Sequence, residues 1–172
     1  MPPLYDSEAV EPLRDELTYV GFRSLADDAE VDRAMAEAEH GTALIVVNSV
    51  CGCAAGSCRP GVMHALQNER IPDHLLTVFA GVDTEATDRV RDRLAGMEPS
   101  SPSVFLLNKG SVVLGLGRHD IEGMSAQEVA DTLRTAFDKE CLARGPSIPR
   151  ETFEGILPVE ECGSAIPPYQ GN

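Results

Sequence analysis

The chain has 172 residues, of which 42% are hydrophobic and 24% charged, a composition typical of one globular domain with or without a tail. Its 28 acidic residues outnumber its 14 Lys and Arg residues, which argues against binding to nucleic acid or to an anionic membrane. The longest apolar stretch, residues 43–47, is too short to span a bilayer, and the N-terminus lacks a signal-peptide pattern. We therefore expect a cytoplasmic protein.

The first part of the chain predicts two helices and a strand. Apolar residues recur at helical spacing over residues 7–20. A second helix is expected over residues 27–40, because Asp27 and Glu30 form a capping-box pattern at its start. Residues 42–48 are almost all apolar and rich in β-branched side chains, which predicts a strand buried on both faces.

The following part predicts three more strands and three more helices. The strands are expected over residues 74–80, 104–108 and 111–116. The helices are expected up to about residue 70, over 84–95 and over 126–140. Asp83 is the expected cap of the middle helix, and Ser125 and Glu128 form a capping box before the last. The turn Asn108-Lys109-Gly110 joins the last two strands into a hairpin.

The character of the chain changes after Cys141. Residues 142–172 contain five of the twelve prolines and show no apolar periodicity. We therefore predict a domain over residues 1–141, followed by a Pro-rich tail over 142–172 without regular structure, which either wraps the domain or is disordered. Removal of this tail is expected to leave a folded core.

The order of the elements predicts an α/β architecture. From residue 42 the order is strand, helix, strand, helix, strand, strand, helix. The first two strands are joined through a helix and should run parallel, whereas the hairpin strands are antiparallel. A mixed four-stranded sheet with helices on both faces, the thioredoxin-like core, satisfies this order. The two N-terminal helices are an addition to it.

Two of the five cysteines occupy a position suited to redox chemistry. Cys51 and Cys53 directly follow the first buried strand and precede a helix. Free N–H groups at a helix N-terminus favour the thiolate, which is the attacking species. Structural disulfides are rare in cytosolic proteins, which leaves catalysis, metal binding or inert burial, and the position after the strand favours catalysis. A Zn or Cu site of Cys51, Cys53 and Cys58 is the alternative, although its spacing differs from that of common zinc sites.

A disulfide between Cys51 and Cys53 would close a small ring. Residues two apart in an extended chain lie at or beyond the Cα separation that a disulfide allows, so we expect Gly52 to bend the chain. Strain in this ring would make the disulfide oxidising, which suits isomerisation or removal of thiol adducts.

Strand directions bring two further segments to the cysteines. The third core strand should run antiparallel to the first, so that Ser101 and Pro102 lie at the same edge of the sheet. The fourth strand reverses again and returns Arg118 and His119 to that edge. A cation there would lower the pKa of a thiol and attract carboxylates on a small thiol. Together with Gly52, these four residues are the expected substrate-binding residues.

A resemblance to the bacilliredoxin family rests on the segments VNSVCGCAAGSCRPG, SSPSVFLL and RHDIEG and covers roughly residues 5–141. It implies a thioredoxin fold and removal of a small thiol, bacillithiol, from protein mixed disulfides, together with thiol–disulfide isomerase activity. It also implies that Cys51 is the nucleophile, Cys53 the resolving thiol and Pro102 a cis-proline. The small thiol is a co-substrate, and no other cofactor or metal is implied.

The remaining features depart from a typical thioredoxin or carry no chemistry. Ile45 stands where thioredoxins keep a buried acid, so we expect proton transfer through water or His119. Cys58 and Cys141 are expected to be buried and inert, and Cys162 to be a loosely packed thiol of the tail.

Overall fold

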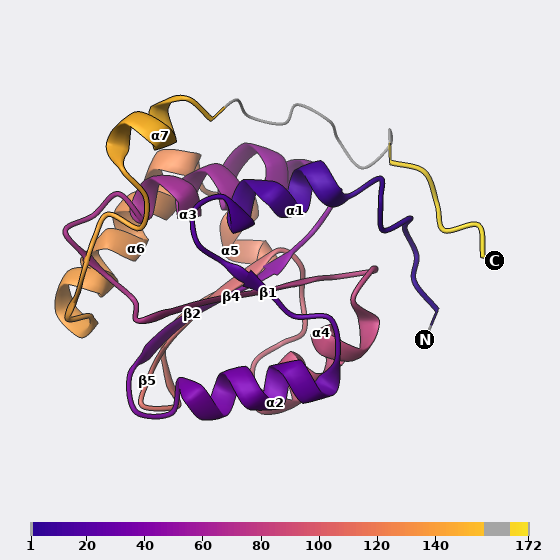
Figure 1. Cartoon of the computed structure of the whole chain (residues 1–172), viewed down its shortest axis with the longest axis horizontal. Coiled ribbons are helices and arrows are strands. Elements are labelled where there is room, and N and C mark those ends of the chain that lie inside the picture. The colour runs from indigo at the N-terminus through magenta and orange to yellow at the C-terminus, as the bar shows by residue number, and fades with distance from the viewer. Residues whose placement is uncertain (1, 157–165, 172) are drawn as a thin grey trace.

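The computed structural model describes residues 2–156 and 166–171. Its centre is a mixed five-stranded sheet with the strand order β1-β4-β2-β5-β6 (Figure 1). The strands β1, β4 and β2 are parallel to one another. The strand β5 is antiparallel to β2, and β6 is antiparallel to β5. A second, two-stranded sheet pairs β3 with β7. The strands are Arg23–Ser24 (β1), Thr42–Asn48 (β2), Arg70–Ile71 (β3), His74–Phe79 (β4), Ser103–Asn108 (β5), Ser111–Leu116 (β6) and Ala143–Arg144 (β7).

Helices cover both faces of the sheet, as the sequence predicts. In the described residues they are α1 (Glu11–Thr18), α2 (Asp28–Glu37), the π-helical segment η1 (Ala54–Cys58), α3 (Arg59–Ala65), α4 (Thr84–Arg93), α5 (Arg118–Glu122), α6 (Ala126–Glu140) and α7 (Arg150–Glu154). One face packs under α1, α3 and α6, and the other under α2 and α4 (Figure 1). None of these helices is long and apolar enough to cross a membrane.

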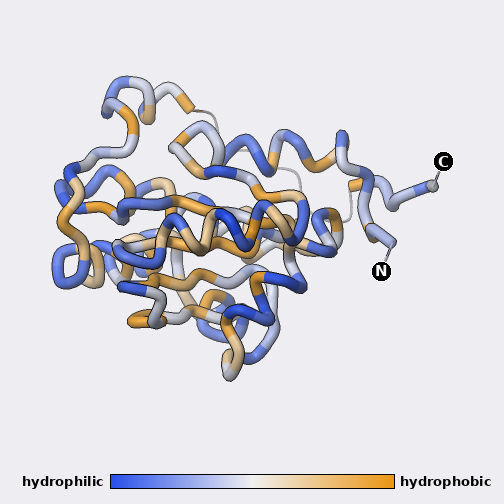
Figure 2. The backbone as a smooth tube through the Cα atoms, turned by 60° about the horizontal axis from the view of Figure 1, so that its bottom comes forward, coloured by the Kyte–Doolittle hydropathy of each residue, from blue (hydrophilic) through white to orange (hydrophobic). Residues whose placement is uncertain are grey.

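The strand β2 lies at the centre of the sheet between β4 and β5. All seven of its residues are buried, because each face of the sheet is covered. Leu44 and Val46 point to the core under α1, α3 and α6, and Ile45 and Val47 to the core under α2 and α4. Figure 2 shows these hydrophobic segments in the middle of the molecule and hydrophilic turns on the outer helices.

The sheet has one strand more than the four predicted. The additional strand, β1, is only two residues long and pairs in parallel with β4. The helix predicted up to residue 70 is also too long, since α3 ends at Ala65 and Arg70–Ile71 forms β3. A strand of two residues is too short to show an alternation of polar and apolar positions, so β1 and β3 could not be predicted from the sequence pattern.

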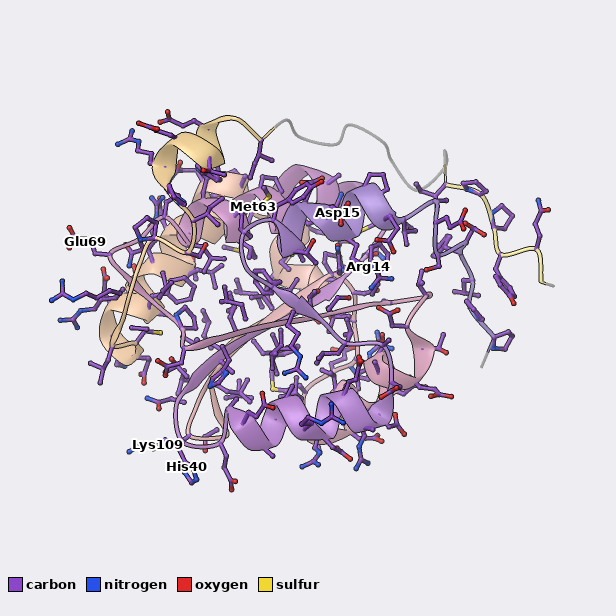
Figure 3. All side chains as sticks on the ribbon, in the orientation of Figure 1. Arg14, Asp15, His40, Met63, Glu69 and Lys109 are labelled. Atoms are coloured by element: carbon purple, nitrogen blue, oxygen red, sulfur yellow. The ribbon has the colours of Figure 1, made fainter. Side chains whose placement is uncertain are left out.

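The β5–β6 hairpin turns through Lys109 and Gly110, as predicted. Their φ angles are 52° and 79°, the left-handed pair that a type I′ turn requires. The Lys109 N–H donates to the Gly41 carbonyl at 2.9 Å, and Figure 3 shows Lys109 close to His40. The turn therefore lies at the end of β2 that is remote from the cysteines.

Of the two helix caps predicted for α6 and α4, the structure contains the first but not the second. The Glu128 N–H donates to Ser125 Oγ at 3.1 Å, and the Ser125 N–H donates to Glu128 Oε2 at 2.7 Å, so the capping box of α6 is confirmed. Asp83 precedes α4, but its carboxylate accepts from Arg14 Nη1 at 2.7 Å and from the Phe79 N–H at 3.0 Å instead. A partly buried ion pair with Arg14 has thus replaced the expected cap.

The chain after Cys141 contains regular structure, which contradicts the prediction of an irregular tail. β7 pairs with β3, and α7 follows it. Ile148, Phe153 and Ile156 pack against the core formed by α1, α3 and α6. The prediction failed because a two-residue strand and a five-residue helix are too short to show periodicity.

The first and last described segments lie side by side. Tyr5 forms an antiparallel bridge with Pro168, and the Tyr169 N–H donates to the Leu4 carbonyl at 3.0 Å. The Leu4 N–H in turn donates to the carbonyl of Gly81, just after β4, at 2.7 Å. Figure 1 shows both ends on the same side of the molecule.

Gly61 marks a close approach of α3 to α6, and we expect Gly61→Ala to disturb it. An added Cβ would lie 2.6 Å from Val129 Cβ and 2.8 Å from the Ala126 carbonyl oxygen. Overpacking of this kind lowers the free energy of unfolding by about 1–3 kcal/mol, which urea denaturation measures. Gly56→Ala is the matched control, because a Cβ there meets nothing within 4 Å. Equal stability of the Gly61→Ala variant and the parent would contradict this packing.

Removal of residues 142–172 is expected to lower the free energy of unfolding, because it uncovers the core beneath Ile148, Phe153 and Ile156. Partial burial of three such side chains corresponds to roughly 2–4 kcal/mol. Cooperative unfolding should persist, since the cores on both faces of the sheet come mainly from earlier residues. Urea denaturation of the truncated and full chains decides the matter, with Phe153→Ala as the intermediate case. A truncated chain as stable as the full chain would contradict the observed packing.

Candidate active site

Cys51 and Cys53 lie where β2 gives way to a helix, as predicted. The N–H groups of Ala54 and Ala55 donate to the Cys51 carbonyl at 3.1 and 3.2 Å, so the first helical turn begins at Cys51. Both cysteines are half-buried free thiols. Their Sγ atoms are 2.9 Å apart and share a hydrogen bond.

The surroundings lower the pKa of the Cys51 thiol below its ordinary value. Burial raises this pKa, but hydrogen bonds from Cys53, the Ala54 N–H and Ser49 outweigh burial, and the positive charge of Arg118 adds to them. Each of these groups stabilises the thiolate relative to the thiol. Cys51 is therefore prepared to act as a nucleophile.

The same neighbourhood has the opposite effect on Cys53. Burial, the hydrogen bond to Cys51 and the negative charge of Cys51 raise the pKa of Cys53 to about 11. Each thiol affects the ionisation of the other, so that Cys51 loses its proton first while Cys53 keeps its own. One environment therefore shifts the pKa values of these two neighbouring thiols in opposite directions.

The other cysteines lie away from this chemistry. Cys58 and Cys141 are buried as predicted, and burial raises the pKa of Cys58 to about 12 and that of Cys141 to about 11. Cys162 lies outside the described residues. Across residues 2–156 and 166–171, no three His, Cys, Asp or Glu side chains are grouped so that they could hold a metal ion. This observation counts against the metal site proposed from the spacing of Cys51, Cys53 and Cys58.

Two loops return to the cysteines, as the strand directions predict. The Ser101–Pro102 peptide bond is cis, and Ser101 lines a cavity together with Cys51. Arg118 begins α5 and lines the same cavity. His119 is exposed and lines a neighbouring cavity with Arg118 instead. The structure thus brings Ser101 and Arg118 to Cys51 but turns His119 away from it.

Comparison with known proteins places this dithiol in a family. A family model described as disulphide isomerase matches residues 5–141. The chain is 49% identical over 138 residues to a bacilliredoxin of Geobacillus kaustophilus, which covers 80% of this chain and 94% of that relative. The chain belongs to the bacilliredoxin family. It is a thiol–disulfide oxidoreductase, and the matched residues include Cys51 and Cys53.

Two further bacilliredoxins have similar sequences. One, from Staphylococcus haemolyticus, is 44% identical over 138 residues, which covers 80% of this chain and 94% of the relative. The other, from Salinibacter ruber, is 46% identical over 157 residues, which covers 88% of this chain and 92% of the relative. The family likeness therefore extends over most of both chains in each comparison.

The chain bends at Gly52, as predicted, but this bend does not depend on glycine. Gly52 lies in a helical turn, a conformation open to any residue. Helical geometry already brings Cα atoms two residues apart to about 5.4 Å, which is within the range of a disulfide. A Cβ at Gly52 would meet nothing within 4 Å. Gly52 is exposed, so the surface beside the two cysteines is open at this position.

A buried polar network lies behind the cysteines and was not predicted. Arg59 is fully buried, and its Nη1 donates to Asn48 Oδ1 at 3.1 Å and to the Ser49 carbonyl at 2.8 Å. Its Nε lies 3.5 Å from Oε1 of Glu16, which is 4% exposed. A buried acid is therefore present, but α1 supplies it rather than β2. The signal in the sequence was Glu16 itself, which falls on the buried stripe of α1 with Leu13 and Leu17.

Ser49 is the second residue that the sequence did not reveal. Its Oγ accepts a hydrogen bond from the Cys51 N–H at 3.4 Å and its hydroxyl stabilises the Cys51 thiolate. A serine that follows a strand is too common to be singled out from the sequence. Its position next to the sulfur becomes visible only once Arg59 and Asn48 are seen to hold it.

Cys51 is expected to be alkylated by iodoacetamide faster than the other thiols at about pH 6, because its thiolate is the most stabilised. Arg118→Gln should shift the pH profile of this reaction to higher pH, since the positive charge that lowers the pKa of Cys51 is lost. Alkylation rates against pH, with peptide mapping, measure both effects.

Arg93→Gln is the control for that experiment, because Arg93 pairs with Asp32 on α2 at 2.6 Å. This variant should keep the parent pH profile. An unchanged profile in Arg118→Gln, or faster alkylation of Cys53 than of Cys51, would refute the assignment of the nucleophile.

Proposed function

We propose that this chain removes a low-molecular-weight thiol from protein mixed disulfides, with Cys51 as the nucleophile and Cys53 as the resolving thiol. The observation that carries the proposal is the opposite effect of one environment on two adjacent thiols, which lowers the pKa of Cys51 and raises that of Cys53. The names of the relatives support bacillithiol as the small thiol. The reducing cytoplasm, where thiols are kept free, is the compartment that suits this reaction.

The proposed fold family is thioredoxin-like. Support comes from the parallel pair β2 and β4, the antiparallel β5 and β6, and a dithiol at the helix start after β2. The cis peptide bond at Pro102, directly before β5, agrees with this assignment. The strand β1 and the helices α1 and α2 are additions to that core.

In the first step the Cys51 thiolate attacks the sulfur of the small thiol in the mixed disulfide. The bond between the small thiol and the client protein breaks, and the client leaves as a thiolate that takes up a proton. A new disulfide then joins the small thiol to Cys51. The uncovered face at Gly52 admits the client, and Arg118 stabilises the thiolate before attack.

In the second step Cys53 loses its proton and attacks the Cys51 sulfur. The small thiol leaves as a thiolate and is protonated, and a Cys51–Cys53 disulfide remains until a thiol reductant opens it. The negative charge on Cys51 is one cause of the high pKa of Cys53, so its loss in the first step lowers that pKa. A second small thiol can replace Cys53 in this step and leaves as the symmetric disulfide.

Disulfide isomerisation is a second candidate activity, which the description of the matching family model favours. It needs only the first kind of attack. Cys51 opens a disulfide of a client protein, and another thiol of the same client then attacks the mixed disulfide and releases Cys51. No net oxidation or reduction results.

Cys51→Ser is expected to abolish removal of bacillithiol from a model protein, because the first attack requires the activated thiolate. Cys53→Ser should still accept the small thiol and hold it as a stable mixed disulfide on Cys51. Added free bacillithiol should then restore turnover to Cys53→Ser but not to Cys51→Ser. Mass spectrometry resolved in time follows both the adduct and the released client.

Cys58→Ser serves as the control for these variants, since Cys58 is buried outside the site. It should retain the parent turnover. Equal loss in Cys51→Ser and Cys53→Ser without rescue would indicate an obligate dithiol reaction and refute the second route. Full activity in Cys51→Ser would refute the proposed function.

A further inference from the structure

A cavity of about 290 Å³ opens beside Cys51. Its walls come from the segment before α1, from the end of β2, from one side of α4, from the cis-proline loop and from α5. Residues that line it include Cys51, Thr87, Asp88, Arg91, Ser101 and Arg118. The attacking sulfur is therefore part of the wall of a cavity large enough for a small organic molecule.

One wall of this cavity has polar groups without partners. Thr87 is 3% exposed, and its Oγ1 has no hydrogen-bond partner among the described residues. Thr132 and Thr135 in α6 each donate to the carbonyl four residues earlier, at 2.8 and 2.9 Å, as threonines in helices commonly do. Buried hydroxyls are almost always hydrogen-bonded, and Thr87 is one of the residues that line the cavity, so an acceptor bound there would supply the missing partner.

Arg91 adds an available cation to the same wall. It lies one helical turn after Thr87 on α4, and its Nε is buried without a hydrogen-bond partner in the described part of the chain. The other arginines of α4, Arg89 and Arg93, both bind Asp32, at 2.8 and 2.6 Å. The ion pairs among the described residues do not include Arg91, so its guanidinium is available for an anion in the cavity that Cys51 also lines.

Two guanidinium groups and a carboxylate define the chemistry of the cavity. Arg91 and Arg118 both line it, although Arg118 also pairs with Glu122 at 2.8 Å. Asp88, one residue after Thr87, is the acidic side chain in the lining and can accept a hydrogen bond from a hydroxyl or an amine. A small molecule with a carboxylate and hydroxyl or amino groups therefore matches the walls.

We propose that this cavity binds the small-thiol half of the mixed disulfide, with Arg91 binding a carboxylate of that thiol and the Thr87 hydroxyl donating a hydrogen bond to it. The inference rests on the proposed function, since it names the part of the substrate that remains on Cys51 after the first step. Arg91 and Thr87 act as binding residues that select a carboxylate-bearing thiol. The client protein approaches from the uncovered side at Gly52.

The test measures transfer of a small thiol to Cys51 in a Cys53→Ser background, where the adduct is stable. Two mixed disulfides of one model protein are compared, one with bacillithiol and one with its methyl ester, which lacks the negative charge of the carboxylates. Arg91→Gln should lower the second-order rate constant for bacillithiol at least about tenfold, as expected for loss of a hydrogen bond to a charged group. It should leave the rate constant for the ester unchanged.

Further variants separate binding from folding. Thr87→Val, which fills the same space, should lower the rate constant for bacillithiol about threefold, and Thr87→Ser should restore it. Arg93→Gln is the matched control on the same helix and should alter neither rate constant. Thermal unfolding of each variant checks that the fold is retained.

The possible results are distinguishable. Loss of rate with bacillithiol alone in Arg91→Gln supports the proposal. Equal losses with both thiols, or no loss with either, overturn it and leave the proposed function intact. If the parent Cys53→Ser protein accepts neither thiol on Cys51, the proposed function itself is wrong, and the binding site with it.

Discussion

The buried guanidinium of Arg59 joins three elements behind the reactive thiols. It comes from α3, binds the end of β2 through Asn48 and the Ser49 carbonyl, and faces Glu16 of α1. Burial of a charge is costly unless its partners are well placed, so these contacts constrain where α1 and α3 meet the strand. Because Ser49 is held in this way, its hydroxyl remains next to Cys51. The lowered pKa of the Cys51 thiol thus depends on the packing behind it as well as on the helix start.

The sequence could predict the elements that carry a period or a cap. The bounds of β2, β6 and α6 agree with prediction, because a continuous apolar run, a turn with two left-handed residues and a capping box each leave a local signature. Short elements such as β1 and α7 leave none. The position of Cys51 and Cys53 was also predictable, since it follows from the order of a strand and a helix.

Other parts of the site depend on contacts that only the fold creates. Asp83 binds Arg14 rather than its own helix, because α1 brings that arginine to it from 69 residues away. Arg118 and His119 separate because successive residues of a helix point about 100° apart, and α5 was not predicted. Thr87 and Arg91 belong to an ordinary amphipathic pattern in the sequence. That Thr87 Oγ1 and Arg91 Nε have no hydrogen-bond partner among the described residues is a property of the fold and not of the pattern.

Because Cys58 is fully buried, its reaction with reagents in solution can report local unfolding of the protein. Burial also raises the pKa of the Cys58 thiol to about 12, so we expect reagents in water to reach this sulfur only when the segment around η1 and α3 separates from the core. Cys51 and Cys53, by contrast, are only half-buried in the closed fold. Labelling of the two sites therefore reports two different processes, chemistry at the surface and local unfolding of the core. An oxidant that converts Cys51 and Cys53 to a disulfide should leave the Cys58 thiol unoxidised for as long as the fold stays closed.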